Sequence, residues 1–349
     1  MLASNDYLDL ARDPRVTAAA ADAAVRWGAG SGGSRLTTGT QPPHAALEAH
    51  LARFKGTEAA LTWATGYMAN LGIVSALVRK GDAVLSDELN HASIIDGCRL
   101  SGADVIVYRH RDMADLERKL AGCREYRRRL VVSDAVFSMD GDVLDLLAFI
   151  DVCGRHDAFS MVDEAHSTGV LGACGHGICE HFRCSPPDIL MGTLSKALGS
   201  EGGYACASGA IIEHLRNVSR PFIFSTAPGA PAVAAADAAL SILEAEPERV
   251  VQLRDNVRFF VSELARHGVN VPEVETAIVP IRVGDERVAV RIAQELESVG
   301  IFVSAIRYPS VARGAARLRT TVMSAHARDD LSRAAAEIAR LMRRYASGR

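Results

Sequence analysis

Long apolar runs are missing from this chain. No stretch approaches the roughly 20 consecutive apolar residues that a helix needs to cross a bilayer. The opening MLASNDYLDL has neither the basic segment nor the apolar core of a secretory signal. We therefore expect a soluble, cytoplasmic protein without a membrane partner.

An excess of charge of one sign is also missing. Lys and Arg number 39 and Asp and Glu number 42, for a formal net charge of −3. The basic residues are dispersed, so neither nucleic acid nor an anionic membrane is expected as a partner. The seven cysteines are an odd number scattered from Cys98 to Cys206, which argues against a disulfide framework and favours a reducing compartment.

The chain does have the composition of a helix-rich α/β enzyme, with 48% hydrophobic residues and only 5% aromatic ones. Its 349 residues are too many for one core, so we expect two packed units. Helices are expected over 14–27 and from residue 42. Mostly continuous apolar segments indicate strands buried on both faces of a parallel sheet, at 83–86, 105–108, 130–136, 159–163 and 188–193.

The pattern changes near residue 228. One long helical region is expected over about 231–267, followed by a smaller α+β unit with strands at 278–283, 301–306 and 318–324 and a last helix from residue 328. The expected division is an N-terminal segment over 1–40, a large domain over 41–228 and a small domain over 229–349.

Functional candidates follow three of the predicted strands, where ligands of open parallel sheets gather. Ser138 follows one strand, Asp163 and His166 follow the next, and a third leads into a segment with Thr193, Ser195 and Lys196. A lysine amine with a carboxylate at a neighbouring strand end is the pair that pyridoxal 5′-phosphate (PLP) needs. The amine forms a Schiff base and the carboxylate keeps the ring nitrogen protonated. The hydroxyls of Thr193 and Ser195 suit a phosphate. The residues alone leave an unrelated α/β fold open.

Two other motifs are weighed and set aside. Gly28, Gly30 and Gly33 match a nucleotide-binding glycine pattern, but their loop follows a helix instead of a strand. A dense cluster of cysteine and histidine suggests a zinc site; its members are Cys174, His176, Cys179, His181 and Cys184. The cluster lacks the paired C-x2-C-like spacing of structural zinc sites, so no metal is expected.

A set of longer motifs resembles the α-oxoamine synthases, a family of PLP-dependent acyltransferases, and the resemblance is closest to its 8-amino-7-oxononanoate synthases. The motifs run in family order along the chain: SNDYL (4–8), GSGGSRLTTG (30–39), TGYMANLG (65–72), LNHASIIDG (89–97), VFSMDGD (136–142), VDEAHSTGVLG (162–172), TLSKALGSEGGY (193–204), RPFIFST (220–226) and ARLRTTVMSAH (316–326). The resemblance implies a fold-type-I PLP transferase with a mostly parallel central sheet and a smaller α+β C-terminal domain.

The same resemblance implies a role for each matched residue. Lys196 would bind PLP and later remove the substrate α-proton, with Asp163 on the ring nitrogen, His166 on the phenolic oxygen and His91 stacked on the ring. Arg319 would clamp the amino-acid carboxylate. The remaining residues implied at the cofactor or the substrate are Asn5, Gly66, Tyr67, Ser138, Thr193, Ser195 and Ser310.

The implied reaction is a decarboxylative condensation of an amino acid with an acyl-CoA or acyl-carrier-protein thioester. L-alanine with a pimeloyl thioester, giving 8-amino-7-oxononanoate for biotin, is the first hypothesis. Glycine with a short acyl-CoA, as in 2-amino-3-ketobutyrate ligase or 5-aminolevulinate synthase, is the second. A non-catalytic partner subunit is the third, and the joint presence of Lys196, Asp163, His166 and His91 argues against it.

The resemblance also implies a homodimer with active sites at the subunit interface. Ser310 stands where members usually carry a threonine that reaches the neighbouring subunit's site. Members usually have an arm before SNDYL that contributes an arginine to the acyl substrate, and residues 1–40 are expected to lack most of it.

Overall fold

The computed structural model describes residues 1–346, which form two compact units. The large unit consists of Leu10–Val136 and Leu144–Ala245. The small unit consists of Met1–Asp9, Phe137–Val143 and the chain from Glu246 onward. The domain division over 1–40, 41–228 and 229–349 stays a prediction.

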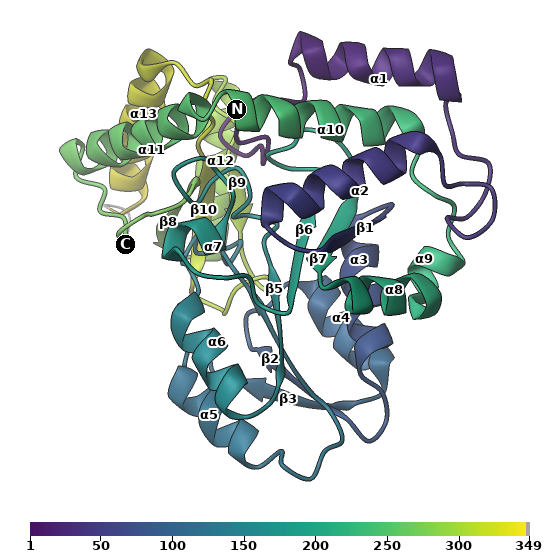
Figure 1. The fold of residues 1–349 in the computed structure, drawn as a ribbon. Helices are drawn as coiled ribbons and strands as arrows, with labels where there is room; N and C mark the ends of the chain where they lie inside the picture. Colours follow the sequence, from purple (N-terminus) through teal and green to yellow (C-terminus); the bar gives the residue numbers. More distant parts are fainter. Residues whose placement is uncertain (347–349) are drawn as a thin grey trace. The chain divides into compact units, whose positions relative to one another are not determined.

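The large unit is built on a seven-stranded sheet with the strand order β1-β7-β6-β5-β4-β2-β3 (Figure 1). β7 pairs antiparallel with both of its neighbours, β1 and β6, and the pairs among β6, β5, β4, β2 and β3 are parallel. The strands are β1 (Ala59–Trp63), β2 (Ala83–Asp87), β3 (Asp104–Tyr108), β4 (Arg129–Asp134), β5 (Phe159–Asp163), β6 (Ile189–Thr193) and β7 (Gly203–Ala207). The mostly parallel α/β sheet expected from the continuous apolar segments is confirmed. The expected strand over 130–136 is shorter at its carboxyl end.

Helices cover both faces of this sheet; in Figure 1, α5 and α6 lie on one side and α3 and α4 on the other. The helices are α1 (Pro14–Trp27), α2 (Pro42–Lys55), α3 (Gly66–Leu77), α4 (Ala92–Ser101), α5 (Met113–Ala121), α6 (Leu146–Arg155), α7 (Ile178–Phe182), α8 (Gly209–Val218), α9 (Arg220–Ile223) and α10 (Ala230–Ala245). Thr65 begins α3 with a side-chain cap on the Met68 N–H, and His91 begins α4 in the same way on Ser93.

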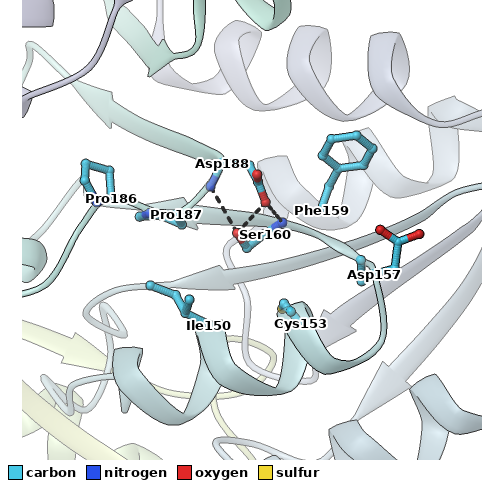
Figure 2. Close-up of a pocket in the computed structure, with 10 residues that line it drawn as sticks. Ile150, Cys153, Asp157, Phe159, Ser160, Pro186, Pro187 and Asp188 are labelled. Atoms are coloured by element: carbon cyan, nitrogen blue, oxygen red, sulfur yellow. Dashed lines mark hydrogen bonds between the residues drawn. The ribbon is translucent and has the colours of Figure 1, made fainter.

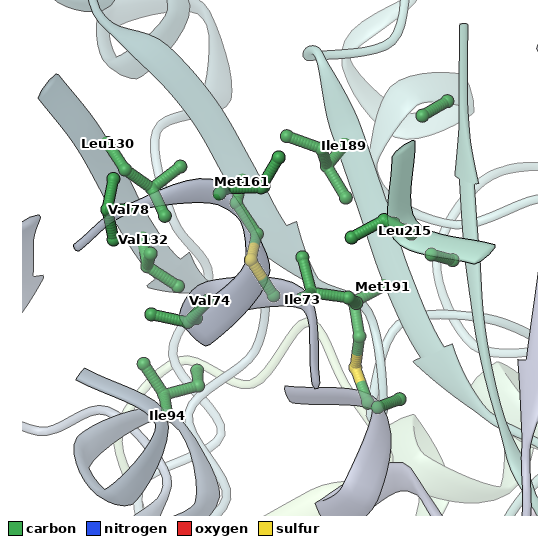
Figure 3. Packing of buried hydrophobic residues seen from close by; sticks show 14 of the residues in the cluster. Ile73, Val74, Val78, Ile94, Leu130, Val132, Met161, Ile189, Met191 and Leu215 are labelled. Atoms are coloured by element: carbon green, nitrogen blue, oxygen red, sulfur yellow. The ribbon is translucent and has the colours of Figure 1, made fainter. Parts of the chain in front are cut away.

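A continuous hydrophobic core holds α3 and α4 against the sheet. Ile73 and Val74 of α3 and Ile94 of α4 are fully buried with Val132 of β4 and Met161 of β5 (Figure 3). Burial of such side chains contributes about 1.5–3 kcal/mol each. The start of α3 is therefore fixed relative to the carboxyl ends of the strands.

The small unit contains a three-stranded antiparallel sheet and three helices. Its sheet has the order β8-β10-β9, with β8 (Ile278–Gly284), β9 (Ser304–Ile306) and β10 (Ala316–Thr321). The helices are α11 (Glu248–Arg266), α12 (Glu286–Ser298) and α13 (Arg328–Ala346). Among the described residues, no helix is long and apolar enough to cross a membrane.

The structure adds detail to two expectations for the C-terminal part. The helical region over 231–267 is two helices, because Pro247 disfavours helical geometry at Glu246. The expected strand over 301–306 is confined to 304–306. Leu2 explains this, since its N–H donates to Phe302 O at 2.8 Å and its C=O accepts from the Thr321 N–H at 2.9 Å, so Leu2 occupies the edge of β10 there.

Candidate active site

The carboxyl ends of β2, β4, β5 and β6 meet at one edge of the large sheet. Parallel pairing in this order requires it. His91 follows β2, Asp134 ends β4, Asp163 ends β5 and Lys196 follows β6. The edge therefore gathers an amine, an imidazole and two carboxyl groups, with Lys196 and Asp163 at the strand ends where the sequence placed them.

Lys196 and His166 are in direct contact, with 3.0 Å between Lys196 Nζ and His166 Nε2. His166 is buried in the segment after β5, and Lys196 is half-buried in the turn between β6 and β7. Leu194 shapes this turn, because its N–H donates to Gly202 O at 2.9 Å and its C=O accepts from the Ser200 N–H at 2.9 Å. The lysine amine is thus presented by a short, hydrogen-bonded connection.

Asp163 is buried beside them with both oxygens hydrogen-bonded. Its Oδ1 accepts from the Ala165 N–H at 2.8 Å, and its Oδ2 accepts from Asn70 Nδ2 at 2.7 Å. Hydrogen bonds from N–H donors stabilise the charged carboxylate. Both carboxylate oxygens of Asp163 are therefore held in fixed positions.

His91 is held at both its backbone and its ring. Its backbone N–H donates to Asp134 Oδ2 at 2.8 Å, and its ring Nδ1 lies 2.7 Å from Ser93 Oγ. Part of the His91 side chain is exposed. The rest is removed from water, which lowers the pKa of His91; the charge of Asp163 opposes this effect and the charge of Lys196 adds to it. Burial, followed by the charge of Asp163, raises the pKa of Asp134 well above its usual value. Because its pKa is lowered, the imidazole of His91 is neutral at neutral pH, and its ring is open to solvent.

Two hydroxyl groups near Lys196 in the sequence lie close to the start of α3. Thr193 Oγ1 lies 2.8 Å from Ser195 Oγ, and α3 begins at Gly66 and Tyr67. A Cβ on Gly66 would lie 3.3 Å from the Thr193 side chain, so glycine lets this helix start approach the hydroxyls. The unpaired N–H groups of a helix N-terminus favour phosphate. The Tyr67 hydroxyl donates to Asp96.

The donor set of the large unit fits PLP. An amine suits the aldehyde, a buried carboxylate suits the ring nitrogen, and the hydroxyls with the α3 N-terminus suit the phosphate. These groups come from β5, from β6 with the turn that follows it, and from the start of α3. Lys196, Asp163 and Thr193 would hold the cofactor at three different points.

The small unit brings three further predicted residues together. Arg319 is buried on β10; its guanidinium donates to the Ser138 carbonyl and to Asn5 Oδ1, at 3.2 Å for Nη2. The Tyr7 hydroxyl also donates to Asn5 Oδ1, at 3.2 Å. Burial, opposed by Arg319, raises the pKa of Tyr7 to about 12. Ser310 lies in an exposed turn, and in the described chain no hydrogen bond joins its hydroxyl to the other residues of this group.

Several residues of the site were not predicted from the sequence. Asn70 and Ser93 contact Asp163 and His91 directly, and both are fully buried. Lys55 and Glu164 form a buried ion pair directly after Asp163. A usable signal was Asn70 itself, a polar residue on the buried face of an apolar helix.

The cysteine-rich segment and the hollow in Figure 2 lie apart from this chemistry. The rings of His176 and His181 pack on Phe54 and Phe182, and among residues 1–346 no group of three or more metal-ligating side chains is placed to hold an ion. The hollow measures about 350 Å³ and opens at the amino ends of β5 and β6, beside Phe159 and Asp188 (Figure 2). Lys196 is at the opposite end of these strands.

Comparisons with known proteins agree over nearly the whole chain. A family model described as aminotransferase class I and II matches residues 1–338. The 8-amino-7-oxononanoate synthase of Anaeromyxobacter dehalogenans is 51% identical over 326 residues, which are 93% of this chain and 82% of that protein. A variant of serine palmitoyltransferase from S. paucimobilis with a bound PLP–myriocin aldimine superposes with a TM-score of 0.95 at 32% identity, over 99% of this chain and 88% of that one. The 8-amino-7-oxononanoate synthase of Francisella tularensis superposes with a TM-score of 0.85 at 29% identity, over 98% and 97% of the two chains.

Proposed function

We propose that this chain, which belongs to the aminotransferase class I and II family and within it to the α-oxoamine synthases, condenses L-alanine with a pimeloyl thioester to give 8-amino-7-oxononanoate. The chain is a PLP-dependent acyltransferase of fold type I. The observation that carries the proposal is the contact of Lys196 Nζ with His166 Nε2 at 3.0 Å, beside Asp163 on the same sheet edge.

PLP, when bound, supplies an electrophilic aldehyde and a ring that accepts electrons from the substrate α-carbon. Lys196 would hold the cofactor, and its Nζ would afterwards take the α-proton of the amino acid. Asp163 would hold a proton on the ring nitrogen, and its two N–H partners support this role by orienting the carboxylate. His166 Nε2 lies within hydrogen-bond distance of the Lys196 amine, and it would contact the cofactor there.

The substrate chemistry takes three steps. Loss of the α-proton gives a carbanion, which forms a C–C bond to the thioester carbonyl as the C–S bond breaks and the thiol leaves. The resulting β-keto acid loses CO₂ and takes up a proton. Arg319 would orient the amino-acid carboxylate, since a guanidinium can offer two parallel donors to a carboxylate.

The acyl substrate and the assembly are further parts of the proposal. The thioester is pimeloyl-CoA or pimeloyl-carrier protein, and the working form is a homodimer in the cytoplasm. The exposed turn that carries Ser310 supports a contact with the neighbouring subunit. L-serine is the second amino acid to consider, because the structural likeness to serine palmitoyltransferase is high.

A matrix of substrates tests the proposal. Purified holoenzyme is mixed with L-alanine, glycine or L-serine and with pimeloyl-, acetyl-, succinyl- or palmitoyl-CoA, and free thiol and CO₂ are measured. We expect release only, or at least tenfold faster, with L-alanine and pimeloyl-CoA. Turnover with glycine and a short acyl-CoA, or with serine and palmitoyl-CoA, would replace the substrates and keep the family.

A further inference from the structure

Asn70 connects the two sides of the candidate active site. Its Nδ2 group donates to Asp163 Oδ2 at 2.7 Å and to Ser93 Oγ at 2.9 Å. Ser93 Oγ in turn lies 2.7 Å from His91 Nδ1. One amide therefore links the carboxylate after β5 to the imidazole before α4.

The direction of each hydrogen bond in this chain is fixed by its end groups. Asp163 can only accept when charged, so the Asn70 group facing it is the NH₂ group. Ser93 Oγ accepts from Asn70, which leaves the single hydroxyl proton for His91 Nδ1. The Ser93 backbone N–H also points to Nδ1, at 3.3 Å. His91 Nδ1 is therefore an acceptor, and the neutral ring carries its proton on Nε2.

The remaining atom of the amide shows that this arrangement is maintained at a cost. Asn70 Oδ1 is buried and, within residues 1–346, has no hydrogen-bond partner. An unsatisfied buried acceptor costs about 1–3 kcal/mol. Rotating the amide would not relieve this cost, because Oδ1 would then face the Asp163 carboxylate. Unpaired buried groups in native structures call for a functional explanation.

The backbone around Asn70 and Ser93 is rigid enough to set these positions. Val74 follows Asn70 by one turn on α3 and is fully buried in the core of Figure 3. Gly97 follows Ser93 by one turn on α4, and a Cβ on Gly97 would lie 3.1 Å from the Asn70 carbonyl oxygen and 3.3 Å from Val74 Cβ. The two helices thus touch at backbone distance one turn from the bridge. This close approach places Ser93 within reach of Asn70.

We propose that Asn70 is a positioning residue that, through Ser93, fixes the Nε2–H tautomer of His91 while it orients the Asp163 carboxylate. The proposal rests on the proposed roles of Asp163 and His91, and it is independent of which amino acid and thioester are used. In this proposal the contacts of His91 and of Asp163 with the cofactor ring depend on each other, because loss of the Asn70 amide would disturb both.

Nitrogen chemical shifts of the His91 ring test the first half of the proposal. The full-length holoenzyme is labelled with ¹⁵N-histidine, and the His91 signals are identified from their absence in His91→Gln. We expect the Nε2–H form in the natural protein at neutral pH. Ser93→Ala and Asn70→Ala should each shift the tautomer ratio toward Nδ1–H by roughly fivefold, which corresponds to one net hydrogen bond.

The affinity for PLP tests the second half. The Kd is measured by absorbance titration of protein freed from the cofactor. Asn70→Ala removes a hydrogen bond to a charged group, so we expect a rise of about tenfold or more. Ser93→Ala leaves the Asp163 contact intact and should change the Kd less. Ser75→Ala is the matched control, because its hydroxyl bonds the Leu71 carbonyl on the same helix and it should alter neither readout.

The outcomes separate this proposal from its alternatives. An unchanged tautomer in both variants, with only lower stability, would make Asn70 a structural residue and overturn the inference. If Asn70→Ala fails to fold, the tautomer in Ser93→Ala decides by itself. A holoenzyme that shows the Nε2–H form and its loss in the variants, but does not condense L-alanine with pimeloyl-CoA, would refute the proposed function and leave this inference standing.

Discussion

The ion pair between Lys55 and Glu164 yields the sharpest stability prediction. Lys55 Nζ lies 2.6 Å from Glu164 Oε2, and the two side chains are 1% and 0% exposed. Lys55 also donates to Thr168 Oγ1 at 2.8 Å and to the His176 carbonyl at 2.7 Å. Burial alone would lower the pKa of Lys55, but the Glu164 carboxylate outweighs it and the pKa is raised. The pair fixes the segment that follows Asp163.

Lys55→Met keeps most of the apolar stem and removes the charge. Glu164 is then left buried and uncompensated, which costs about 3–5 kcal/mol. In the double variant Lys55→Met/Glu164→Gln no charge remains at this position. In the natural protein Glu164 Oε1 accepts a hydrogen bond from the Ile178 N–H at 2.8 Å, and the glutamine side-chain oxygen can still accept it. The double variant should therefore recover most of the loss and remain within about 1–2 kcal/mol of the natural protein. Lys119→Met is the control; Lys119 is 31% exposed and Asp115 keeps its pair with Arg118, so the change should cost at most about 1 kcal/mol.

Urea unfolding followed by tryptophan fluorescence measures these differences. Both tryptophans, Trp27 and Trp63, belong to the large unit, so the signal reports the unit that contains the pair. A raised folded pKa also means that the contribution of Lys55 is complete below its unfolded pKa of about 10.4 and is lost as the pH rises through the folded value. A double variant as unstable as Lys55→Met, or a single variant no worse than the control, would refute the reasoning.

Three further predictions concern the site. Gly203→Ala places a Cβ 2.6 Å from Gly66 Cα and displaces the start of α3, so the Kd for PLP should rise about tenfold or more in an absorbance titration; an unchanged Kd would contradict the proposed phosphate cradle. Arg319→Lys should raise the KM for the amino acid about tenfold or more with a smaller change in kcat, because lysine lacks the two-donor fork; steady-state kinetics in which only kcat falls would argue against the clamp. The pKa of His91 is lowered in the folded chain, so as the pH falls below about 6.5 the unfolded chain takes up the His91 proton first and the free energy of unfolding should decrease. If urea titrations of His91→Gln show the same pH dependence, His91 is not its source.

The parts of the fold that were predictable are those with a strong local pattern. The runs at 83–86, 105–108, 159–163 and 188–193 are continuous and apolar, and each coincides with a strand. β1 and β7 were not predicted, because AALTW and GYACA are short and rich in small residues. Their pairing with each other and with β6 depends on contacts distant in the sequence.

The site shows the same division. Lys196, Asp163 and His166 could be predicted because each stands at or just after a strand end, and parallel strands bring their ends together. Asn70 and Ser93 lie inside helices, and their role depends on how closely α3 and α4 pack at Gly97. Lys55 fits an ordinary helix pattern, and nothing in the sequence indicated that it is buried against Glu164. Helix-to-helix distance and buried charge pairing are tertiary properties, so the local sequence did not contain them.

The central claim is that Lys196 carries PLP. Borohydride reduction of the holoenzyme, followed by digestion and mass spectrometry, tests it directly. We expect one pyridoxyl phosphate group on the peptide that contains Lys196, no such group in Lys196→Ala, and an unchanged result in Lys80→Ala, which replaces an exposed lysine. A label on another lysine of the natural protein, or a labelled Lys196→Ala variant, would contradict the account.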